Sequence, residues 1–255
     1  MNFLEKIELI DVDAANVAEH GVFCIKDKKA AGFHKKVEWF KEKQNKGLTL
    51  KIAIDEKGIQ LGFIEYIPSE QAWRPIKAEN YLFIQCITVY SKKMRNQGLA
   101  SHLIKACEQD AIAHKKDGMC TMSSNGSWLA ERTVFEKYGF VEAEKKGRFE
   151  LLYKSFGNMN TPRFLDWTQE QHHYTGWNLI YANQCPWQAK SIHELSESAK
   201  ANGIDLKIRE LKTPKEAQKA PSGFGVFSLI NDGELLADHY ISKTRFENIL
   251  KKEKV

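Results

Sequence analysis

One stretch of the chain decides the expected fold: ITVYSKKMRNQGLASHL, residues 87–103. It follows a long apolar run that begins at residue 81, and an apolar run of this kind is typical of a strand buried on both faces. It continues into a segment where Leu99, Leu103 and Cys107 recur at helical spacing. Between the two lies a polar, basic loop of the form R-x-x-G-x-A. The stretch therefore predicts a buried strand, a basic loop and an amphipathic helix in succession.

This loop has the chemistry of a phosphate site. The first N–H groups of a helix have no partner within the helix and lie at the positive end of its dipole, so they favour an anion. Gly98 lets the backbone come close to that anion, and Arg95 adds a permanent positive charge. Neither GxxxxGK[ST] nor a GxGxxG following a strand occurs, which excludes two other phosphate motifs. Taken alone, the short pattern fits a pyrophosphate loop and a plain loop equally well.

The first part of the chain surrounds this stretch with alternating patterns of helix and strand. The expected strands are 6–12, 48–55, 61–68, 81–90, 119–123 and a final β segment at 140–156 that is interrupted near 146–147. The expected helices are 13–23, 33–46, the stripe that begins at 99, and 129–138.

A second pattern follows an aperiodic segment. Residues 157–176 read as a linker with some order of its own. The elements expected after it are, in chain order, strand 178–182, helix 187–201, strand 204–211, helix 214–220, strands 225–230 and 235–240, and helix 243–252. We therefore expect an α/β protein with two domains, residues 1–156 and 177–255, joined by the linker 157–176.

Composition narrows the class of protein. The chain has 255 residues, of which 42% are hydrophobic and 28% charged, as expected of a globular protein. No run approaches the roughly 18 apolar residues that span a bilayer, and the N-terminus lacks the pattern of a secretory signal, so a cytoplasmic location with no membrane partner is expected. The net charge is only +5 and the lysines are interleaved with acids, which favours a solvated surface over nucleic-acid binding.

The cysteines point to neither a disulfide framework nor a metal site. The chain has five cysteines, an odd number, and no CxxC or zinc-type spacing occurs. We expect reduced thiols and no bound metal.

The order of these motifs resembles that of the GCN5-related N-acetyltransferases, the GNAT superfamily. The strand 83–90, the loop 95–100, the following helix and the string VFEKYGF at 134–140 stand in the order of that family's acetyl-CoA motifs. The resemblance covers residues 1–156 and implies a central, mostly antiparallel sheet. GFIEYIP at 62–68, AWRP at 72–75 and the tail resemble the bacterial YoaP-type subgroup, which joins a GNAT domain to a small C-terminal domain.

The resemblance implies acetyl-CoA as cosubstrate and assigns the residues that hold it. One set would present main-chain groups of a strand to the pantetheine and thioester: Ile87, Thr88 and Val89. The other set would wrap the pyrophosphate: Arg95, Asn96, Gln97, Gly98, Leu99, Ala100 and Ser101. Ile87 and Val89 also fit a plain strand core, and the two roles are compatible because the contacts are main-chain.

The position that supplies a proton to the leaving thiolate in many GNAT enzymes differs in this chain. Many GNAT enzymes carry a tyrosine where this chain has Phe135, and the usual upstream asparagine becomes Trp128. Tyr138 lies one turn further on, but its direction is not given by the sequence. Another donor or water must act, or the chain does not catalyse transfer.

Candidate residues for the acceptor side are fewer. Glu65, in the middle of a strand, is the candidate general base, with an outward-facing strand residue as the alternative. Trp73 and Arg74 lie in a loop that often lines the acceptor cleft of GNAT enzymes, and Arg74 would favour an acceptor with a carboxylate. The alternative for this pair is a cation–π or packing contact.

Cys185 is the remaining candidate. The order of elements after residue 177 matches a small thioredoxin-like fold, where a C-x-x-C motif sits at this strand-to-helix junction. Here the string is CPWQ at 185–188, so the second cysteine is missing, but a helix N-terminus is expected to lower the pKa of the thiol. A redox-silent docking module and a thiol-dependent catalytic role both stay open.

Three functions follow from these observations. The first is an N-acetyltransferase acting on a primary amine of a small molecule or peptide. The second is a CoA-binding regulatory or interaction protein with a GNAT fold, which Phe135 favours. The third is a thiol-dependent enzyme that uses Cys185. The sequence does not give the acceptor or the oligomeric state.

Overall fold

The structure, a computed structural model, describes residues 3–22, 24–25, 27–90, 97–126, 128–157 and 160–253. Contacts between Cα atoms divide the chain into two compact units. The first comprises Met1–Phe23, Phe40–Ala72 and Ile76–Phe164, and the second comprises Cys24–Trp39, Trp73–Pro75 and Leu165–Val255. None of the described helices is long and apolar enough to cross a membrane.

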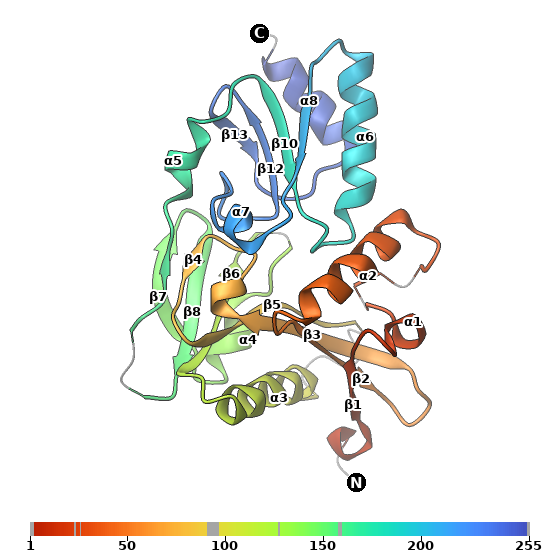
Figure 1. Ribbon diagram of the computed structural model, residues 1–255, viewed down its shortest axis with the longest axis vertical. Coiled ribbons are helices and arrows are strands. Elements are labelled where there is room, and N and C mark those ends of the chain that lie inside the picture. Colours follow the sequence, from red (N-terminus) through yellow and green to blue (C-terminus); the bar gives the residue numbers. More distant parts are fainter. Residues whose placement is uncertain are drawn as a thin grey trace. The chain divides into compact units, whose positions relative to one another are not determined.

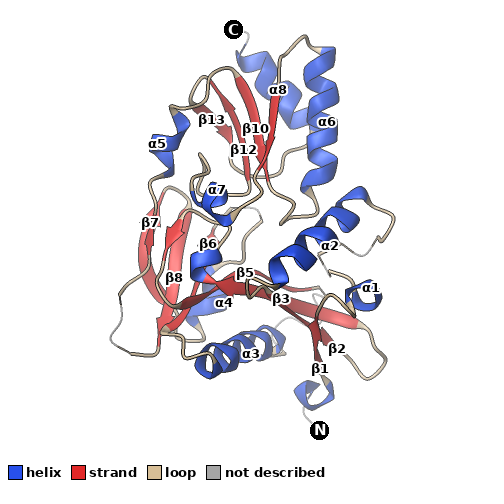
Figure 2. Cartoon of the chain, in the orientation of Figure 1, coloured by secondary structure: helices blue, strands red, loops and turns tan. Residues whose placement is uncertain are grey.

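The first unit is built on a seven-stranded sheet (Figures 1 and 2). Its strands in spatial order are β1 (Glu8–Val12), β2 (Thr49–Ile54), β3 (Gln60–Pro68), β5 (Tyr81–Val89), β6 (Gly118–Ser124), β8 (Phe149–Ser155) and β7 (Val141–Lys146). All neighbouring pairs are antiparallel except β5 and β6, which are parallel. This is the mostly antiparallel mixed sheet that the sequence predicts.

The parallel pair is joined by helix α3 (Leu99–Ala113), which lies along one face of the sheet (Figure 1). The predicted stripe is the buried side of this helix, with Leu99, Leu103 and Cys107 all at most 1% exposed. They pack on Ile64 and other residues of the sheet in one continuous core. Along each strand, alternate side chains point to this face, and the apolar ones among them pack against the apolar side of α3. This match decides which face of the sheet the helix covers.

A polar network ties the far end of α3 to the sheet. The Tyr66 hydroxyl on β3 donates a hydrogen bond to the Asp110 carboxylate on α3. Lys51 Nζ on β2 lies 3.3 Å from Asp110 Oδ2 and 2.5 Å from Asp11 Oδ1 on β1. Burial, then the nearby Cys107 and the bond to Asp110, raises the pKa of Tyr66, so the phenol keeps the proton that it donates.

The smaller elements of the first unit differ most from the sequence prediction. Helix α1 covers only Val17–His20 and α4 only Arg132–Glu136, both shorter than expected. A two-residue strand, β4 (Ile76–Lys77), pairs with β9 (Arg163–Phe164), so order begins inside the segment predicted as a linker. The first unit also contains two 3₁₀ turns, η1 (Phe3–Lys6) and η2 (Ser69–Gln71). Helix α2 (Ala31–Gln44) is divided between the units, with its residues up to Trp39 in the second and those from Phe40 in the first.

The second unit contains a four-stranded sheet (Figure 2). Its strands in spatial order are β11 (Lys207–Glu210), β10 (Trp177–Tyr181), β12 (Phe227–Asn231) and β13 (Glu234–Ala237). Strand β10 is parallel to β11 and antiparallel to β12, and β12 is antiparallel to β13. The helices are α5 (Trp167–Gln171), α6 (Gln188–Ala201), α7 (Pro214–Gln218) and α8 (Lys243–Glu253).

Local sequence explains where the helices of this unit begin. Asp166 accepts a hydrogen bond from the Thr168 N–H and caps α5, a short helix that the sequence analysis missed. Thr213 and Glu216 form a reciprocal capping box at the start of α7.

Helices α6 and α8 contact each other directly. From β10 to α8 the elements follow one another along the chain in the order that the sequence analysis matched to a small thioredoxin-like fold.

Candidate functional site

The sheet of the first unit opens between its two parallel strands. β5 and β6 pair only from Tyr81–Ile84 with Gly118–Thr121. Beyond that point β5 continues to Val89 beside β3, and β6 continues to Ser124 beside β8. Main-chain groups at the end of β5 are therefore not used in pairing with β6. A buried strand with unpaired main-chain groups on one side can bind an extended ligand.

A cleft of about 740 Å³ lies at this opening. It combines the end of β5, the first turn of α3 and the segment around α4, with the lining residues Ile87, Thr88, Val89, Gly98, Leu99, Ala100, Leu129, Ala130, Glu131, Thr133, Val134, Lys137 and Tyr138. Six of the residues predicted from the sequence to hold the cosubstrate are among them. Of the seven from 129 to 138, the sequence analysis named only Tyr138, without assigning it to the site, although the VFEKYGF string marks that segment.

Gly98 gives the α3 end of the cleft its shape. Its φ of +82° lies in the left-handed region, which favours glycine, and its carbonyl accepts the hydrogen bond of the His102 N–H at 2.9 Å. The first turn of α3, a 15-residue helix, therefore lies at the cleft. Its free N–H groups and the positive end of its dipole are at that place. Gln97 and Ser101 are described but do not line the cleft. Arg95 and Asn96 lie outside the described residues.

Two aromatic residues in or next to α4 lie in different surroundings. Phe135, at the position of the family's tyrosine, is 1% exposed and packs on Phe140, with 5.5 Å between ring centroids. Tyr138 is half-buried and lines the cleft. Trp128 is 42% exposed, with a left-handed φ of +78°. The structure thus places Tyr138 at the wall of the cleft, where it also packs against the core under α3.

Glu65 lies in the middle of β3 with its side chain fully buried. Gln85 Nε2 on β5 donates a hydrogen bond to its carboxylate at 3.4 Å. The neighbours of Glu65 along the strand, Ile64 and Tyr66, point into the core under α3, so Glu65 points to the opposite face of the sheet. The alternative of an outward-facing, solvated strand residue is wrong.

Trp73 and Arg74 belong to the second unit and are buried, with 0% and 3% of their surface exposed. The Arg74 guanidinium lies 4.7 Å from the centre of the Phe224 ring and donates to the Trp73 carbonyl at 2.8 Å. Trp73 meets Trp39 edge to face at 5.2 Å. These contacts are those of the packing alternative, and contact with an acceptor stays a prediction for this pair.

Cys185 lies three residues before the start of α6. Burial raises its pKa to about 11, above the ordinary value of 9.0, despite a hydrogen bond from the Trp187 N–H and the positive charges of Lys36 and Arg74. The prediction that the helix N-terminus leaves this thiol with a lowered pKa is therefore wrong. Desolvation of the thiolate outweighs that hydrogen bond and both cations.

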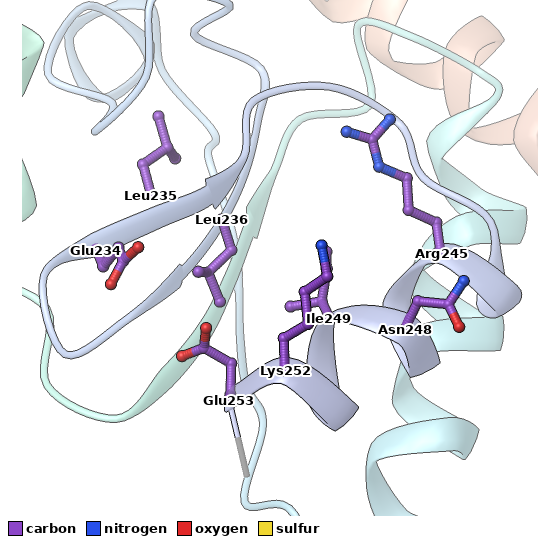
Figure 3. Close-up of a pocket in the computed structure, with 8 residues that line it drawn as sticks. All are labelled: Glu234, Leu235, Leu236, Arg245, Asn248, Ile249, Lys252 and Glu253. Carbon is purple, nitrogen blue, oxygen red and sulfur yellow. The ribbon is translucent and has the colours of Figure 1, made fainter. Parts of the chain in front are cut away.

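A second cavity lies in the second unit, between β13 and α8 (Figure 3). It measures about 360 Å³ and is lined by Glu234, Leu235, Leu236, Arg245, Asn248, Ile249, Lys252 and Glu253. No residue predicted for the site lines it. Acidic, basic and apolar side chains are mixed along its walls, so its composition favours no single class of ligand.

Comparison with known proteins agrees with this geometry. A family model of the acetyltransferase (GNAT) domain matches residues 18–153, more than half of the chain. A second model, described as YoaP-like, matches residues 205–248. The uncharacterized N-acetyltransferase YoaP of Bacillus subtilis (strain 168) is 27% identical over 248 residues, which cover 94% of this chain and 97% of that protein.

Solved structures show more distant likeness. An acetyltransferase of the GNAT family from Staphylococcus aureus Mu50 is 16% identical, with a TM-score of 0.44, over 59% of this chain and 99% of its own. A GNAT family acetyltransferase from Brucella melitensis, solved in complex with acetyl-CoA, is 15% identical, with a TM-score of 0.38, over 62% of this chain and 94% of its own. Identities and TM-scores this low add no argument to the match over residues 18–153. By that match, the chain belongs to the GNAT acetyltransferase family.

Proposed function

We propose that this protein transfers the acetyl group of acetyl-CoA to a primary amine of a small-molecule or peptide acceptor. The observation that carries the proposal is the cleft in which the end of β5 meets the first turn of α3. We assign catalysis to residues 1–156 and treat 177–255 as a separate thioredoxin-like domain after the linker 157–176. The chain's place in the GNAT family supplies the reaction class.

The cleft fits the cosubstrate at both of its ends. Ile87, Thr88 and Val89 would bind the pantetheine arm through main-chain groups, because β5 no longer pairs with β6 there. The residues 97–101, with Arg95 and Asn96, would hold the pyrophosphate. Gly98 begins the helix in a left-handed conformation in which a side chain would be strained, and a Cβ there would lie 3.2 Å from Leu4.

Acetyl transfer forms a carbon–nitrogen bond and breaks a carbon–sulfur bond, so the amine must lose a proton and the thiolate must gain one. We propose Tyr138 as the proton donor to the thiolate, because it lines the cleft. We propose Glu65 as the general base, acting through water, because it lies on the sheet face opposite α3. Phe135 has no proton to donate and is buried in the core.

Cys185 receives no step in this reaction. A thiol-dependent function needs a thiolate near neutral pH, and a pKa of about 11 leaves almost none. A CoA-binding protein without transferase activity is the second candidate, and it is favoured by one observation, the phenylalanine at position 135.

Two measurements on the purified protein test the proposal. Calorimetry measures acetyl-CoA binding, and release of free CoA thiol is followed with amino acids, polyamines, aminoglycosides and peptides as acceptors. Binding with acceptor-dependent thiol release is the expected result. Binding without release for any acceptor would favour the second candidate, and absence of binding would overturn both.

A further inference from the structure

One arginine of the first unit lies at the edge of the opening, outside the cosubstrate cleft. Arg148 belongs to the turn between β7 and β8, and its Nη1 donates a hydrogen bond to Ser124 Oγ at 2.8 Å. Its guanidinium also lies 4.3 Å from the centre of the Phe149 ring. Ser124 is the last residue of β6, so these contacts hold a positive charge where β6 ends beyond its pairing with β5.

A glycine makes room for this arrangement. A Cβ placed on Gly126 would lie 2.7 Å from Arg148 Nη1, closer than real Cβ contacts allow. The backbone after β6 thus passes directly beside the guanidinium. The ring, the hydroxyl and the backbone together fix an otherwise flexible side chain in one place, and Arg148 stays half-buried rather than covered. Fixed arginine side chains of this kind lose little entropy when they bind.

The arginine lies on the face opposite the core of α3. Leu152 of β8 points into that core, so Phe149, three residues earlier, points to the other face. Ser124 is the direct partner of Phe149 across the strands and shares its face. Glu65 of β3 points to this same face. Arg148 thus places a positive charge on the β6–β8 side of the opening, whereas Glu65 lies one strand away on β3, fully buried and hydrogen-bonded to Gln85.

A negatively charged group on the acceptor would complement this positive charge. The planar guanidinium suits a carboxylate, which it can bind through two parallel hydrogen bonds. Arg74, which the sequence offered as the carboxylate-binding residue, is instead 3% exposed and packed on Phe224.

We infer that Arg148 binds the carboxylate of the acceptor, and that the acceptor is a primary amine that also bears a carboxylate, as in an amino acid. This inference rests on the proposed acetyltransferase function and adds the substrate class. It also assigns Ser124 and Phe149 as the residues that position Arg148.

The experiment compares free L-amino acids with their amides, each pair having the same side chain and amine but only one a carboxylate. We expect the wild-type protein to show a kcat/KM at least about tenfold higher for the acids, which is the ratio that one charge-assisted contact supplies. Arg148→Gln should lower kcat/KM for the acids by the factor of the wild-type preference, about tenfold, mostly through KM, and leave the amides within about twofold. Arg148→Lys should restore part of the preference.

A matched control separates this role from general charge and stability. Arg163 is exposed on β9 of the same unit, so Arg163→Gln removes the same charge elsewhere and should keep the full preference. Equal rates for acids and amides in the wild-type protein would overturn the inference. So would equal losses for both in a folded Arg148→Gln protein. Either result would leave the proposed transferase function standing.

A binding measurement covers the case in which no acid or amide is acetylated. The same panel is titrated into the CoA-loaded protein by calorimetry. Binding of acids but not amides, lost in Arg148→Gln, supports the inference. Absence of acid-selective binding overturns it, whereas absence of CoA binding in the first place overturns the proposed function.

Discussion

The backbone N–H of Tyr138 donates a hydrogen bond to the Phe135 carbonyl at 2.8 Å, and this turn sends the two side chains to different places. The Phe135 ring enters the core beside Phe140, while Tyr138 lines the cleft. Tyr138, three residues after the phenylalanine, is therefore the tyrosine that we propose as the proton donor. The consequences for catalysis and for stability can be tested separately.

Tyr138→Phe is expected to lower kcat by about 10- to 100-fold, because general acid catalysis typically contributes 10²- to 10⁴-fold and water can replace part of it. Acetyl-CoA affinity should stay within about twofold, since the ring is kept. Steady-state kinetics across pH, with calorimetry for acetyl-CoA, measures both.

Tyr153→Phe is the matched control for that change. Tyr153 lies on β8 and packs edge to face on Tyr81 at 6.5 Å, and it does not line the cleft. It should keep wild-type kcat. An unchanged kcat in Tyr138→Phe would show that water or another group protonates the thiolate.

Phe135→Ala is expected to lower the free energy of unfolding by about 3–5 kcal/mol, because removing a buried ring leaves a cavity. The ring is 1% exposed and in the core shared by α3 and the sheet. Urea denaturation of the wild type and variant gives the difference. Val141→Ala, at a position 53% exposed on β7, is the control and should change it little. A Phe135→Ala protein as stable as wild type would contradict the observed orientation of α4.

Gly98→Asp is expected to abolish acetyl-CoA binding while the protein stays folded. The change places a negative charge where the pyrophosphate is proposed to bind and puts a side chain at a φ of +82°. The strained backbone costs about 1–2 kcal/mol, which a domain of this size tolerates. Calorimetry measures the binding, and circular dichroism checks the fold.

Gly58→Asp controls for the charge and the strain together. Gly58 has a φ of +73° in the turn between β2 and β3, and a Cβ there would meet no atom within 4 Å. Its acetyl-CoA affinity should match that of wild type. Unchanged affinity in a folded Gly98→Asp protein would remove the pyrophosphate assignment of this loop.

Cys185 is expected to react with iodoacetamide about tenfold more slowly in the folded protein than in the unfolded chain at neutral pH. Raising the thiol pKa from 9.0 to about 11 lowers the thiolate fraction about a hundredfold. The greater nucleophilicity of a more basic thiolate offsets about tenfold of that loss. Timed labelling followed by peptide mapping gives both rates.

The same shift sets a direction for stability against pH. The folded state keeps the Cys185 proton more tightly than the unfolded state, so this contribution is complete below about pH 9 and is lost as pH rises toward about 11. Cys185→Ser should remove this part of the pH dependence. Labelling of Cys185 as fast in the folded protein as in the unfolded chain would contradict the raised pKa.

The long elements could be predicted from the sequence because their patterns agree with their surroundings. The apolar run at 81–89 and the stripe through Leu99 and Leu103 became β5 and α3 with nearly the predicted bounds. Short elements could not be predicted in this way. Strands β4 and β9 have two residues each, too few to show a period, and are defined only by pairing with each other.

The family resemblance located part of the site correctly and left part open. Six predicted residues from Ile87 to Ala100 line the cleft because a strand end and the following helix start are adjacent along the chain. The contact between Arg148 and Ser124 could not be predicted, because the two residues are 24 positions apart and meet only through the pairing of β6 with β8. No local pattern marks such a contact.

By itself, the sequence determined the order of the long elements, the helix-start loop at Gly98 and the family to which the chain belongs, because each depends on residues close together along the chain. Only the tertiary structure decided the place of Tyr138 at the cleft, the burial of Glu65 and the raised pKa of Cys185. These depend on which distant segments exclude water from a side chain. Desolvation depends on all the neighbouring atoms in space, whereas a sequence pattern records only neighbours along the chain.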